Sequence, residues 1–360
     1  MINNFKIKKI LITGSHGYIG SVICPKLEEL GYTVQGIDNG YFLDCLLNGS
    51  IGDLPLTKKH MDDFVEADLK NIDVVIHLAG LQNDPLKSTL PGKVYDIEYA
   101  YTKKLADNCR KLGIQFIYAS SCSIYGAGSD ELLNEEAPAK PLTPYSNNKL
   151  RIEEYLQFIA GDGFNPVMLR FATVYGYSPR MRFDLYINMV VGMALATKKI
   201  QLNSDGLAWR PNLYIEDIPG VIDAVLNRDF SEPTIINIGN QNSNLRVVDV
   251  VEIIKTIEKD VETRLLQPEE NSLYGDQYVT SKKDTRSYRV DFSRMNSILG
   301  VDMCPTDVRR GIATLIKNLK TVVNINKKIK DPHFFRLQWT QELISSNEID
   351  KHFQWRQNNG

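Results

Sequence analysis

Residues 13–20 read Thr13-Gly14-Ser15-His16-Gly17-Tyr18-Ile19-Gly20, between a short apolar run, Lys9–Gly14, and a helical pattern over Ile19–Leu30. Glycines at such a junction let the backbone turn sharply and approach a pyrophosphate, whose charge the helix N-terminus stabilises. Three glycines alone also occur in ordinary strand–helix turns, but this context favours a dinucleotide site. We expect dinucleotide contacts from Gly14, His16, Gly17, Tyr18, Ile19 and Gly20.

A second apolar run, Thr33–Asp38, ends in a carboxylate 18 residues after Gly20. An acid at this place hydrogen-bonds the adenosine ribose hydroxyls and would repel a 2′-phosphate, so NAD is favoured over NADP. The alternative is a turn-forming aspartate in Asp38-Asn39-Gly40. For the pair Asp68-Leu69, an adenine pocket and a helix cap are both open. The expected cofactor site is completed by Asn39, Asp68, Leu69, Leu78, Ala79 and Gly80.

Further apolar runs predict a parallel sheet. Asp73–Gly80, Gln115–Ser121 and Pro166–Tyr175 show no alternation, as is typical of strands covered on both faces, and helical segments such as Ala100–Leu112 lie between them. This rhythm predicts an α/β fold, a Rossmann-type doubly wound parallel sheet, over residues 1–176.

The rhythm changes after Gly176. We expect a smaller α+β substrate lobe over residues 177–320, with 212–240 returning to the sheet. Residues 321–360 are polar with scattered aromatic side chains. They predict a helical tail that packs either on the body of the protein or on another subunit.

Composition excludes several classes of function. The 360 residues carry a net charge of −2, which favours neither nucleic acid nor an anionic membrane. No apolar run approaches the roughly 18 residues of a membrane span, and the polar N-terminus does not resemble a signal peptide. The 5 cysteines are scattered without a zinc-ligand pattern. We expect a cytoplasmic protein with reduced cysteines and no metal.

A catalytic pair is indicated by Tyr145-Ser146-Asn147-Asn148-Lys149, which places a phenol and an ammonium four residues apart on one helix face. A free phenol has a pKa of about 10, so a phenol base needs its anion stabilised, here by Lys149 and a positive nicotinamide ring. Ser121, at the end of its strand, can donate a hydrogen bond to the reacting oxygen. Tyr99 and Lys103 have the same spacing, but they precede the serine strand, and we interpret them as structural.

The order TGSHGYIG, HLAG, SSCSIYG, YSNNK and LRFATVYG, over roughly residues 8–320, resembles the extended short-chain dehydrogenase/reductases. This family includes UDP-galactose 4-epimerase and dTDP-glucose 4,6-dehydratase. The resemblance implies a tightly held NAD, a catalytic triad of Ser121, Tyr145 and Lys149 whose last two members also contact NAD, and commonly a homodimer.

The same resemblance implies a nucleotide-diphosphate sugar as substrate. Trp209–Asp217 is similar to a segment whose arginine, here Arg210, meets the diphosphate, and Arg286 lies in a region similar to a second clamp that also holds Lys282 and Lys283. Guanidinium groups bind phosphate oxygens in a bidentate manner, although a solvated surface charge is the alternative for each. The expected substrate contacts are completed by Ser121, Ser123, Thr173 and Asn83. For the segment of Asn83, a loop cap is the alternative to a sugar contact.

Departures from the family narrow the reaction. Cys122-Ser123 stand where the dehydratases carry an acidic pair, and Glu98 and Thr173 stand where asparagine is common, so 4,6-dehydration is disfavoured. We expect an NAD-dependent nucleotide-sugar epimerase that acts at C4 through a keto intermediate. A nucleotide-sugar dehydrogenase or 4-keto reductase is the alternative from the same site, and an NAD-sensing binding protein without chemistry is the alternative from another class.

Overall fold

The computed structural model describes residues 8–48, 56–81, 91–126, 131–202, 204–265, 286–350 and 352–356. Within these residues seven strands form a sheet in the order β11-β7-β5-β4-β1-β2-β3, and every neighbouring pair is parallel. The strands are β1 (Lys9–Thr13), β2 (Thr33–Asp38), β3 (Leu56–Lys58), β4 (Val74–His77), β5 (Gln115–Ser121), β7 (Val167–Phe171) and β11 (Thr234–Ile238).

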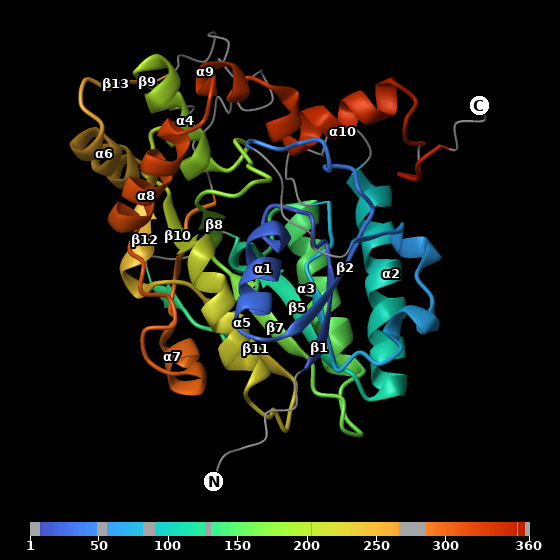
Figure 1. The fold of residues 1–360 in the computed structure, drawn as a ribbon. Coiled ribbons are helices and arrows are strands. Elements are labelled where there is room, and N and C mark those ends of the chain that lie inside the picture. Colours follow the sequence, from blue (N-terminus) through green and yellow to red (C-terminus); the bar gives the residue numbers. More distant parts are fainter. Residues whose placement is uncertain are drawn as a thin grey trace.

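Helices cover both faces of this sheet (Figure 1). One face carries α2 (Pro91–Leu112) and α3 (Pro144–Phe158), and the other carries α1 (Gly20–Glu29) and α5 (Ile218–Leu226). Because consecutive strand residues point to opposite faces, Leu11 belongs to the hydrophobic cluster under α2 and α3, while its neighbours in β1 belong to the other cluster. The doubly wound Rossmann-type α/β fold predicted from the sequence is confirmed.

The order of the strands reverses between β1 and β4. The helix after β1 covers one face, and the helix after β4 covers the opposite face. In doubly wound sheets, ligands bind in the crevice at the carboxyl ends of the strands at this point. Here the two strand ends carry the turn that starts at Gly14 and the segment Leu78-Ala79-Gly80.

A smaller lobe is built beside the sheet. Its three-stranded sheet contains β8 (Thr173–Tyr175), β10 (Trp209–Tyr214) and β12 (Asn244–Arg246). Its other elements are the strand pairs β9 (Lys199–Leu202) with β13 (Glu262–Leu265) and β6 (Leu132–Leu133) with β14 (Arg289–Val290), and the helices α4 (Tyr186–Thr197), α6 (Val247–Ile257), α7 (Ser293–Leu299) and α8 (Val308–Lys320).

Two sequence expectations differ from this arrangement. The run Pro166–Tyr175 is not one strand, because the chain leaves the central sheet at Ala172, whose N–H donates to the carbonyl oxygen of Ile238 (2.9 Å). Of the segment 212–240, the strand β11 lies in the central sheet, whereas the end of β10 pairs with β8 in the lobe. An apolar run indicates that a segment is buried, but it does not indicate which sheet provides the neighbouring strands.

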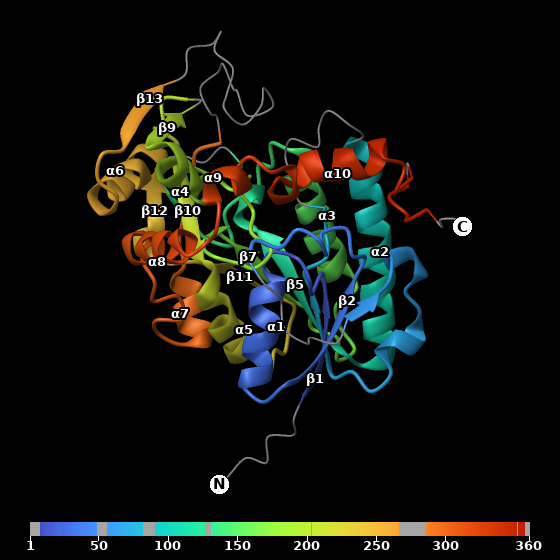
Figure 2. The ribbon, with the colours of Figure 1, turned by 45° about the horizontal axis from the view of Figure 1, so that its top comes forward.

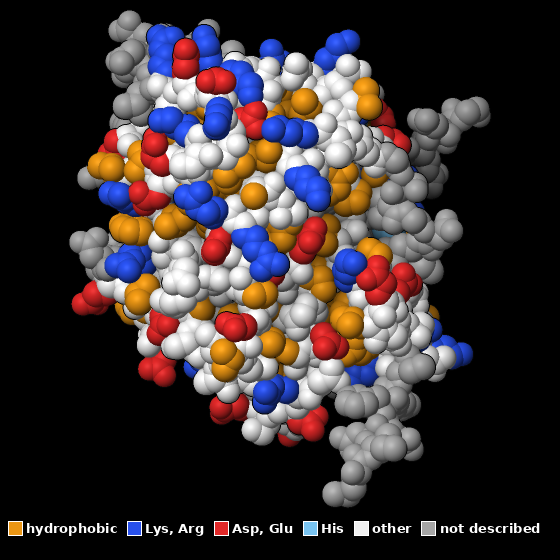
Figure 3. All heavy atoms as spheres, turned by 60° about the vertical axis from the view of Figure 1, so that its left-hand side comes forward, with side chains coloured by type: hydrophobic (Ala, Val, Ile, Leu, Met, Phe, Trp, Pro, Cys, Tyr) orange, Lys and Arg blue, Asp and Glu red, His pale blue; other side chains and the backbone are white. Residues whose placement is uncertain are grey.

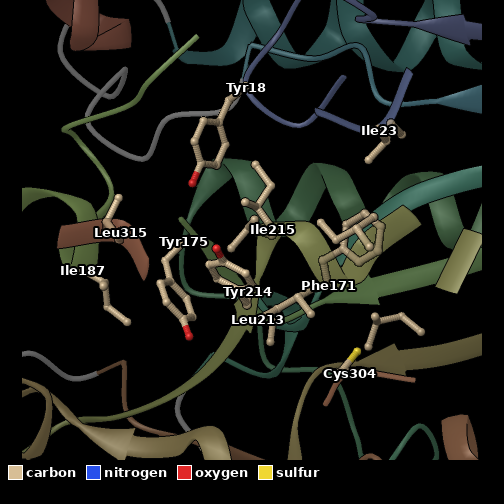
Figure 4. Close-up of a cluster of buried hydrophobic side chains, with 14 of the residues drawn as sticks. Tyr18, Ile23, Phe171, Tyr175, Ile187, Leu213, Tyr214, Ile215, Cys304 and Leu315 are labelled. Atoms are coloured by element: carbon tan, nitrogen blue, oxygen red, sulfur yellow. The ribbon is translucent and has the colours of Figure 1, made fainter. Parts of the chain in front are cut away.

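Large buried side chains join the lobe to the glycine turn (Figure 4). Tyr18 comes from the turn after β1, Tyr175 from β8 and Tyr214 from β10, and all three belong to the main hydrophobic cluster. The hydroxyl group of Tyr18 donates to the carbonyl oxygen of Gly176 (2.8 Å) and accepts a hydrogen bond from Nδ2 of Asn188 (3.0 Å). The lobe is therefore held against the turn that the sequence assigns to a dinucleotide.

The C-terminal segment contains α9 (Ile325–Lys328) and α10 (Arg336–Ser345), and α10 crosses above the carboxyl ends of the strands (Figures 1 and 2). Trp339 Nε1 donates to the carbonyl oxygen of Tyr41 (2.7 Å), directly after β2. Of the two packing partners left open by the sequence, the segment contacts the body of its own chain. No helix in the described ranges is long and apolar enough to cross a membrane.

A buried ion pair fixes α3 to the sheet. Arg170 in β7 donates from Nη2 to Glu153 Oε2 (2.7 Å) and from Nε to Oε1 (3.0 Å). Ser120 in β5 donates to the same carboxylate, and Arg170 Nη1 donates to the hydroxyl group of Tyr125 (2.9 Å). The Glu153 side chain is 0% exposed and that of Arg170 is 6% exposed, so each group depends on the other for its solvation.

We predict that Arg170→Met lowers the free energy of unfolding by about 3–5 kcal/mol, because it leaves the Glu153 carboxylate buried without its cation. The double variant Arg170→Met/Glu153→Leu should recover most of this loss. Urea unfolding of the wild type, both single variants and the double variant measures the coupling. Additive losses in the double variant would contradict the pair's interdependence.

Candidate active site

A cavity of about 930 Å³ lies at the carboxyl ends of the strands, between the central sheet and the smaller lobe. This volume is at the upper end of the range for small-molecule sites. It brings together most of the residues singled out in the sequence: Gly14, Gly17, Tyr18, Ile19, Gly20, Asp38, Asn39, Leu78, Ala79, Gly80, Ser121, Ser123, Tyr145, Thr173, Arg210 and Arg286. Residues of both the sheet and the lobe therefore face one enclosure.

The glycine turn has the geometry that a diphosphate requires. Gly14 has a φ of +72°, and a Cβ atom there would lie 2.9 Å from the backbone of Ala79. A Cβ atom on Gly20 would lie 2.3 Å from the carbonyl oxygen of Gly14, so α1 starts in direct contact with the turn. No side chain caps the N-terminus of α1. The N–H groups of Ser21 and Val22 already donate to the carbonyl oxygens of Gly17 (3.0 Å) and Ile19 (3.0 Å). The positive end of the helix dipole still favours an anion here, and this part of the cavity fits the diphosphate of NAD.

Asp38 closes the turn at the end of β2. Its Oδ2 accepts the backbone N–H of His16 (3.1 Å), and its Oδ1 accepts the backbone N–H of Gly40 (2.8 Å). An ionised carboxylate has about four acceptor sites, so these two bonds leave capacity for ribose hydroxyl groups. The carboxylate therefore has the turn-forming role, and this role does not exclude ribose binding, which the sequence presented as the alternative.

Four residues of the expected set do not line the cavity: His16, Asp68, Leu69 and Lys149. Asp68 forms an ion pair with Lys59 (2.7 Å) and accepts the backbone N–H of Val65 (2.8 Å), which is the helix-cap role. Leu69 is buried. His16 is buried as well, and its own burial lowers the pKa of its imidazole. Asn83, Lys282 and Lys283 lie outside the described residues.

Helix α3 presents three functional groups on one face. Thr143 caps the helix by accepting the N–H of Ser146 (3.1 Å), and Pro144 occupies the first turn. Tyr145 therefore sits at the positive end of the helix dipole, which favours a negative charge nearby. Lys149 and Glu153 follow at four-residue intervals, and both are buried against the sheet.

Lys149 shares its buried site with a carboxylate that the sequence did not assign to the site. Lys149 Nζ donates to the carbonyl oxygen of Ala119 (3.1 Å) and lies 3.5 Å from Glu98 Oε1. Its distance from the centre of the Tyr145 ring is 5.7 Å. Burial lowers the pKa of Lys149 and raises that of Glu98, and the attraction between the two groups opposes both shifts. Glu98 Oε2 has no hydrogen-bond partner among the described residues.

The second tyrosine–lysine pair lies elsewhere. Tyr99 is outside the cavity lining and stacks against the guanidinium of Arg151, whose Cζ is 3.6 Å from the ring centre. Lys103 lies over the ring of Tyr155, with 4.9 Å between Nζ and the ring centre. These contacts join α2 to α3 and are structural.

The two residues after Ser121, Cys122 and Ser123, have different environments. Cys122 is 1% exposed and donates from Sγ to the carbonyl oxygen of Arg170 (3.1 Å), away from the cavity. Ser123 lines the cavity, and its Oγ has no partner within the described part of the chain. All five cysteines are buried free thiols, and the described residues hold no group of three side chains suited to a metal ion.

Sequence reasoning missed several residues that line the cavity. These are Tyr41, Phe42, His60, Met61, Glu98, Tyr101, Arg182, Arg336, Thr340 and Phe353. Glu98 was visible only as a departure from the family pattern. The C-terminal residues had no local signal, because their place in the cavity depends on how α10 packs on the loop after β2.

Comparisons with known proteins agree with this geometry. Residues 10–239 match the model of the NAD dependent epimerase/dehydratase family. An uncharacterized UDP-glucose epimerase of Bacillus subtilis, YtcB, is 32% identical over 263 residues, which cover 68% of this chain and 82% of that protein. The dTDP-D-glucose 4,6-dehydratase of Mus musculus is 26% identical over 71% of this chain and 76% of its own length.

The structure of MoeE5 in complex with UDP-glucuronic acid and NAD superimposes with a TM-score of 0.73 at 26% identity, over 88% of this chain and all (100%) of MoeE5. Three observations indicate that the cofactor is NAD: the NAD in the MoeE5 complex, the family match, and the fit of the glycine turn to a diphosphate. The chain is an NAD-dependent enzyme, and it belongs to the NAD-dependent epimerase/dehydratase family, the extended short-chain dehydrogenase/reductases that its motifs resemble.

Proposed function

We propose that this protein is a nucleotide-sugar epimerase that inverts C4 of the sugar through a keto intermediate. The observation that carries the proposal is the shared cavity, in which the glycine turn, Tyr145 and Arg210 face the same space. The glycine turn would hold NAD, which would supply a reversible acceptor for a hydride from the sugar carbon. Return to the opposite face of the keto sugar inverts the carbon without net oxidation.

In this proposal Tyr145 removes the proton of the C4 hydroxyl group and returns it in the second half of the cycle. The charge of Lys149 and the N-terminus of α3 stabilise the resulting phenolate. Ser121 donates a hydrogen bond to the reacting oxygen as it becomes a carbonyl. Glu98 holds Lys149 in place from the opposite helix.

Arg210 and Arg286 are proposed to bind the diphosphate of the substrate. Both line the cavity. Arg210 belongs to β10 of the smaller lobe, and Arg286 precedes Ser287, whose Oγ accepts the N–H of Trp209 (3.1 Å). Basic and acidic side chains are mixed over the face on the left-hand side of Figure 1 (Figure 3), and the net charge is −2. Diffuse attraction therefore contributes little, and specific guanidinium contacts must hold the anion. Ser123 and Thr173 lie at the sugar end of the cavity in this proposal.

The relatives include both epimerases and a dehydratase, so likeness alone leaves the reaction open. The environment of Cys122 and Ser123 favours the epimerase. A dehydratase of the 4,6 type needs acids that move protons at C5 and C6, whereas Cys122 is buried away from the cavity and Ser123 is not acidic at neutral pH. Burial also raises the pKa of the Cys122 thiol.

The direct test is to incubate the protein with UDP- and dTDP-linked hexoses and to analyse the products by NMR and mass spectrometry. We expect a C4 epimer of unchanged mass and no net change in nicotinamide absorbance. A product lighter by one water would make the enzyme a dehydratase. Stoichiometric formation or consumption of NADH would make it a dehydrogenase or a reductase.

Tyr145→Phe should lower the rate by at least about a hundredfold, because general acid–base catalysis contributes at least that much. Its affinity for NAD should remain close to that of the wild type. Tyr99→Phe is the matched control, since it removes the same hydroxyl group from the pair outside the cavity. A greater loss of rate in Tyr99→Phe than in Tyr145→Phe, with both proteins folded, would refute the assignment of the base.

The carboxylate of Asp38 should make the protein bind NAD at least tenfold more tightly than NADP, about 1.4 kcal/mol, by repelling the 2′-phosphate. Asp38→Ser should narrow this ratio, and Asp44→Asn, which removes an exposed carboxylate from the same loop, should not. Calorimetry with both dinucleotides measures the ratio. Equal or tighter binding of NADP by the wild type would disprove the role of Asp38.

A further inference from the structure

The C-terminal segment is fixed to the loop that follows Asp38. Trp355 Nε1 donates to the carbonyl oxygen of Asn39 (2.6 Å), two residues before the carbonyl that accepts from Trp339. Lys58 of β3 lies over the Trp355 ring, with Nζ 4.3 Å from the ring centre. A separate hydrophobic cluster contains Tyr41 of this loop together with C-terminal side chains such as Phe353. The segment therefore has a defined position beside the cofactor end of the cavity.

Arg336, the first residue of α10, reaches the cavity from this segment. It is 8% exposed, and its Cζ lies 3.7 Å from the centre of the Phe42 ring. Its Nη1 has no hydrogen-bond partner in any of the described ranges. Burial lowers the pKa of the guanidinium to about 10, so the group stays charged at neutral pH. A buried guanidinium nitrogen without a hydrogen-bond partner is costly, which indicates that a ligand supplies the partner.

The charged groups near Arg336 leave room for an anion. Both oxygens of Asp184 accept from Arg182, from Nε (2.9 Å) and Nη2 (2.9 Å), and Oδ2 also accepts the backbone N–H of Arg336 (3.4 Å). Arg180 donates from Nη1 to the carbonyl oxygen of Phe42 (2.6 Å). The carboxylate of Asp38 is already bonded to the glycine turn and its own loop. Arg182 and Arg336 thus line the cavity together with Asp38 and Asp184, whose oxygens already accept from Arg182 and from backbone N–H groups.

We propose that Arg336 binds the diphosphate of NAD, so that the C-terminal segment forms part of the cofactor site. Two diphosphates, that of NAD and that of a nucleotide sugar, share the chemistry that Arg336 recognises. The position of Arg336 favours NAD. It stacks on Phe42, four residues after Asp38, and lines the same cavity as Gly17 and Tyr18 of the glycine turn. Arg210 and Arg286 approach from the smaller lobe instead.

This arrangement has a consequence for the exchange of the cofactor. A dinucleotide held between the glycine turn and Arg336 is released only when α10 moves from the loop after β2. The segment should therefore slow the dissociation of NAD. The inference depends on the NAD site alone and holds whichever reaction the family member catalyses.

The test compares Arg336→Met with Arg356→Met, which removes an identical but exposed guanidinium from the end of the same segment. Calorimetry on the full chain freed of nucleotide should show NAD binding weakened by about 10- to 100-fold in Arg336→Met and unchanged in Arg356→Met, as for the loss of a charge-assisted hydrogen bond. Binding of UDP to the NAD-saturated variants should match that of the wild type. Arg210→Ala should show the opposite pattern, with weaker binding of UDP and unchanged binding of NAD.

Thermal unfolding separates ligand binding from a structural role. Without NAD, Arg336→Met should be at least as stable as the wild type, because it removes a buried guanidinium whose Nη1 has no hydrogen-bond partner among the described residues. With NAD it should gain less stability than the wild type. Arg336→Lys keeps a charge but not the planar guanidinium, so it should recover only part of the affinity for NAD. If the methionine variant does not fold, the lysine variant tests whether Arg336 binds NAD. Unchanged affinity for NAD in either folded variant, or weaker binding of UDP alone, would overturn the proposal.

Discussion

The close approach of α1 to the turn after β1 is the contact on which the site depends. Any side chain at Gly20 would place its Cβ atom 2.3 Å from the carbonyl oxygen of Gly14, and any side chain at Gly14 would meet the backbone of Ala79. These two positions therefore let one helix start at the junction of two strand ends. The N-terminus of α1 then points into the crevice where the order of the strands reverses, and an anion there meets the positive end of the helix dipole.

Two buried ion pairs hold the catalytic helix over this crevice. Arg170 and Glu153 join α3 to β7, while Lys149 and Glu98 join it to α2. Buried pairs add little net stability compared with apolar packing, but they tolerate few alternative arrangements because each charge needs its partner. In this protein Lys149 and Glu153 follow Tyr145 at four-residue intervals, so both pairs attach the face of α3 that carries Tyr145. The Glu98 carboxylate also means that the charge of Lys149 is partly balanced within the site.

The smaller lobe and the C-terminal segment enclose the crevice from two sides. The lobe is anchored through Tyr18, whose hydroxyl group bonds to Gly176 and Asn188, so the substrate side of the cavity is attached directly to the cofactor turn. The C-terminal segment is anchored through tryptophan N–H groups on the loop after β2. Enclosure on both sides limits the access of water to the cavity. Under the proposed function, this favours a redox cycle that closes within one active site.

The sequence by itself determined the doubly wound fold, the glycine turn, Asp38 and the spacing of Tyr145 and Lys149. Each of these is a local pattern. The spacing of apolar residues indicates which side chains of a segment are buried, and the glycines of a turn indicate the backbone conformation of that turn. Tertiary structure alone decided that the run Pro166–Tyr175 divides between two sheets at Ala172 and that Asp68 pairs with Lys59. It also decided that Glu98 faces Lys149 and that Arg336 reaches the cavity. These contacts join residues that are far apart in the chain. They depend on how the helices and sheets pack on one another, and the local spacing of residues does not indicate that packing.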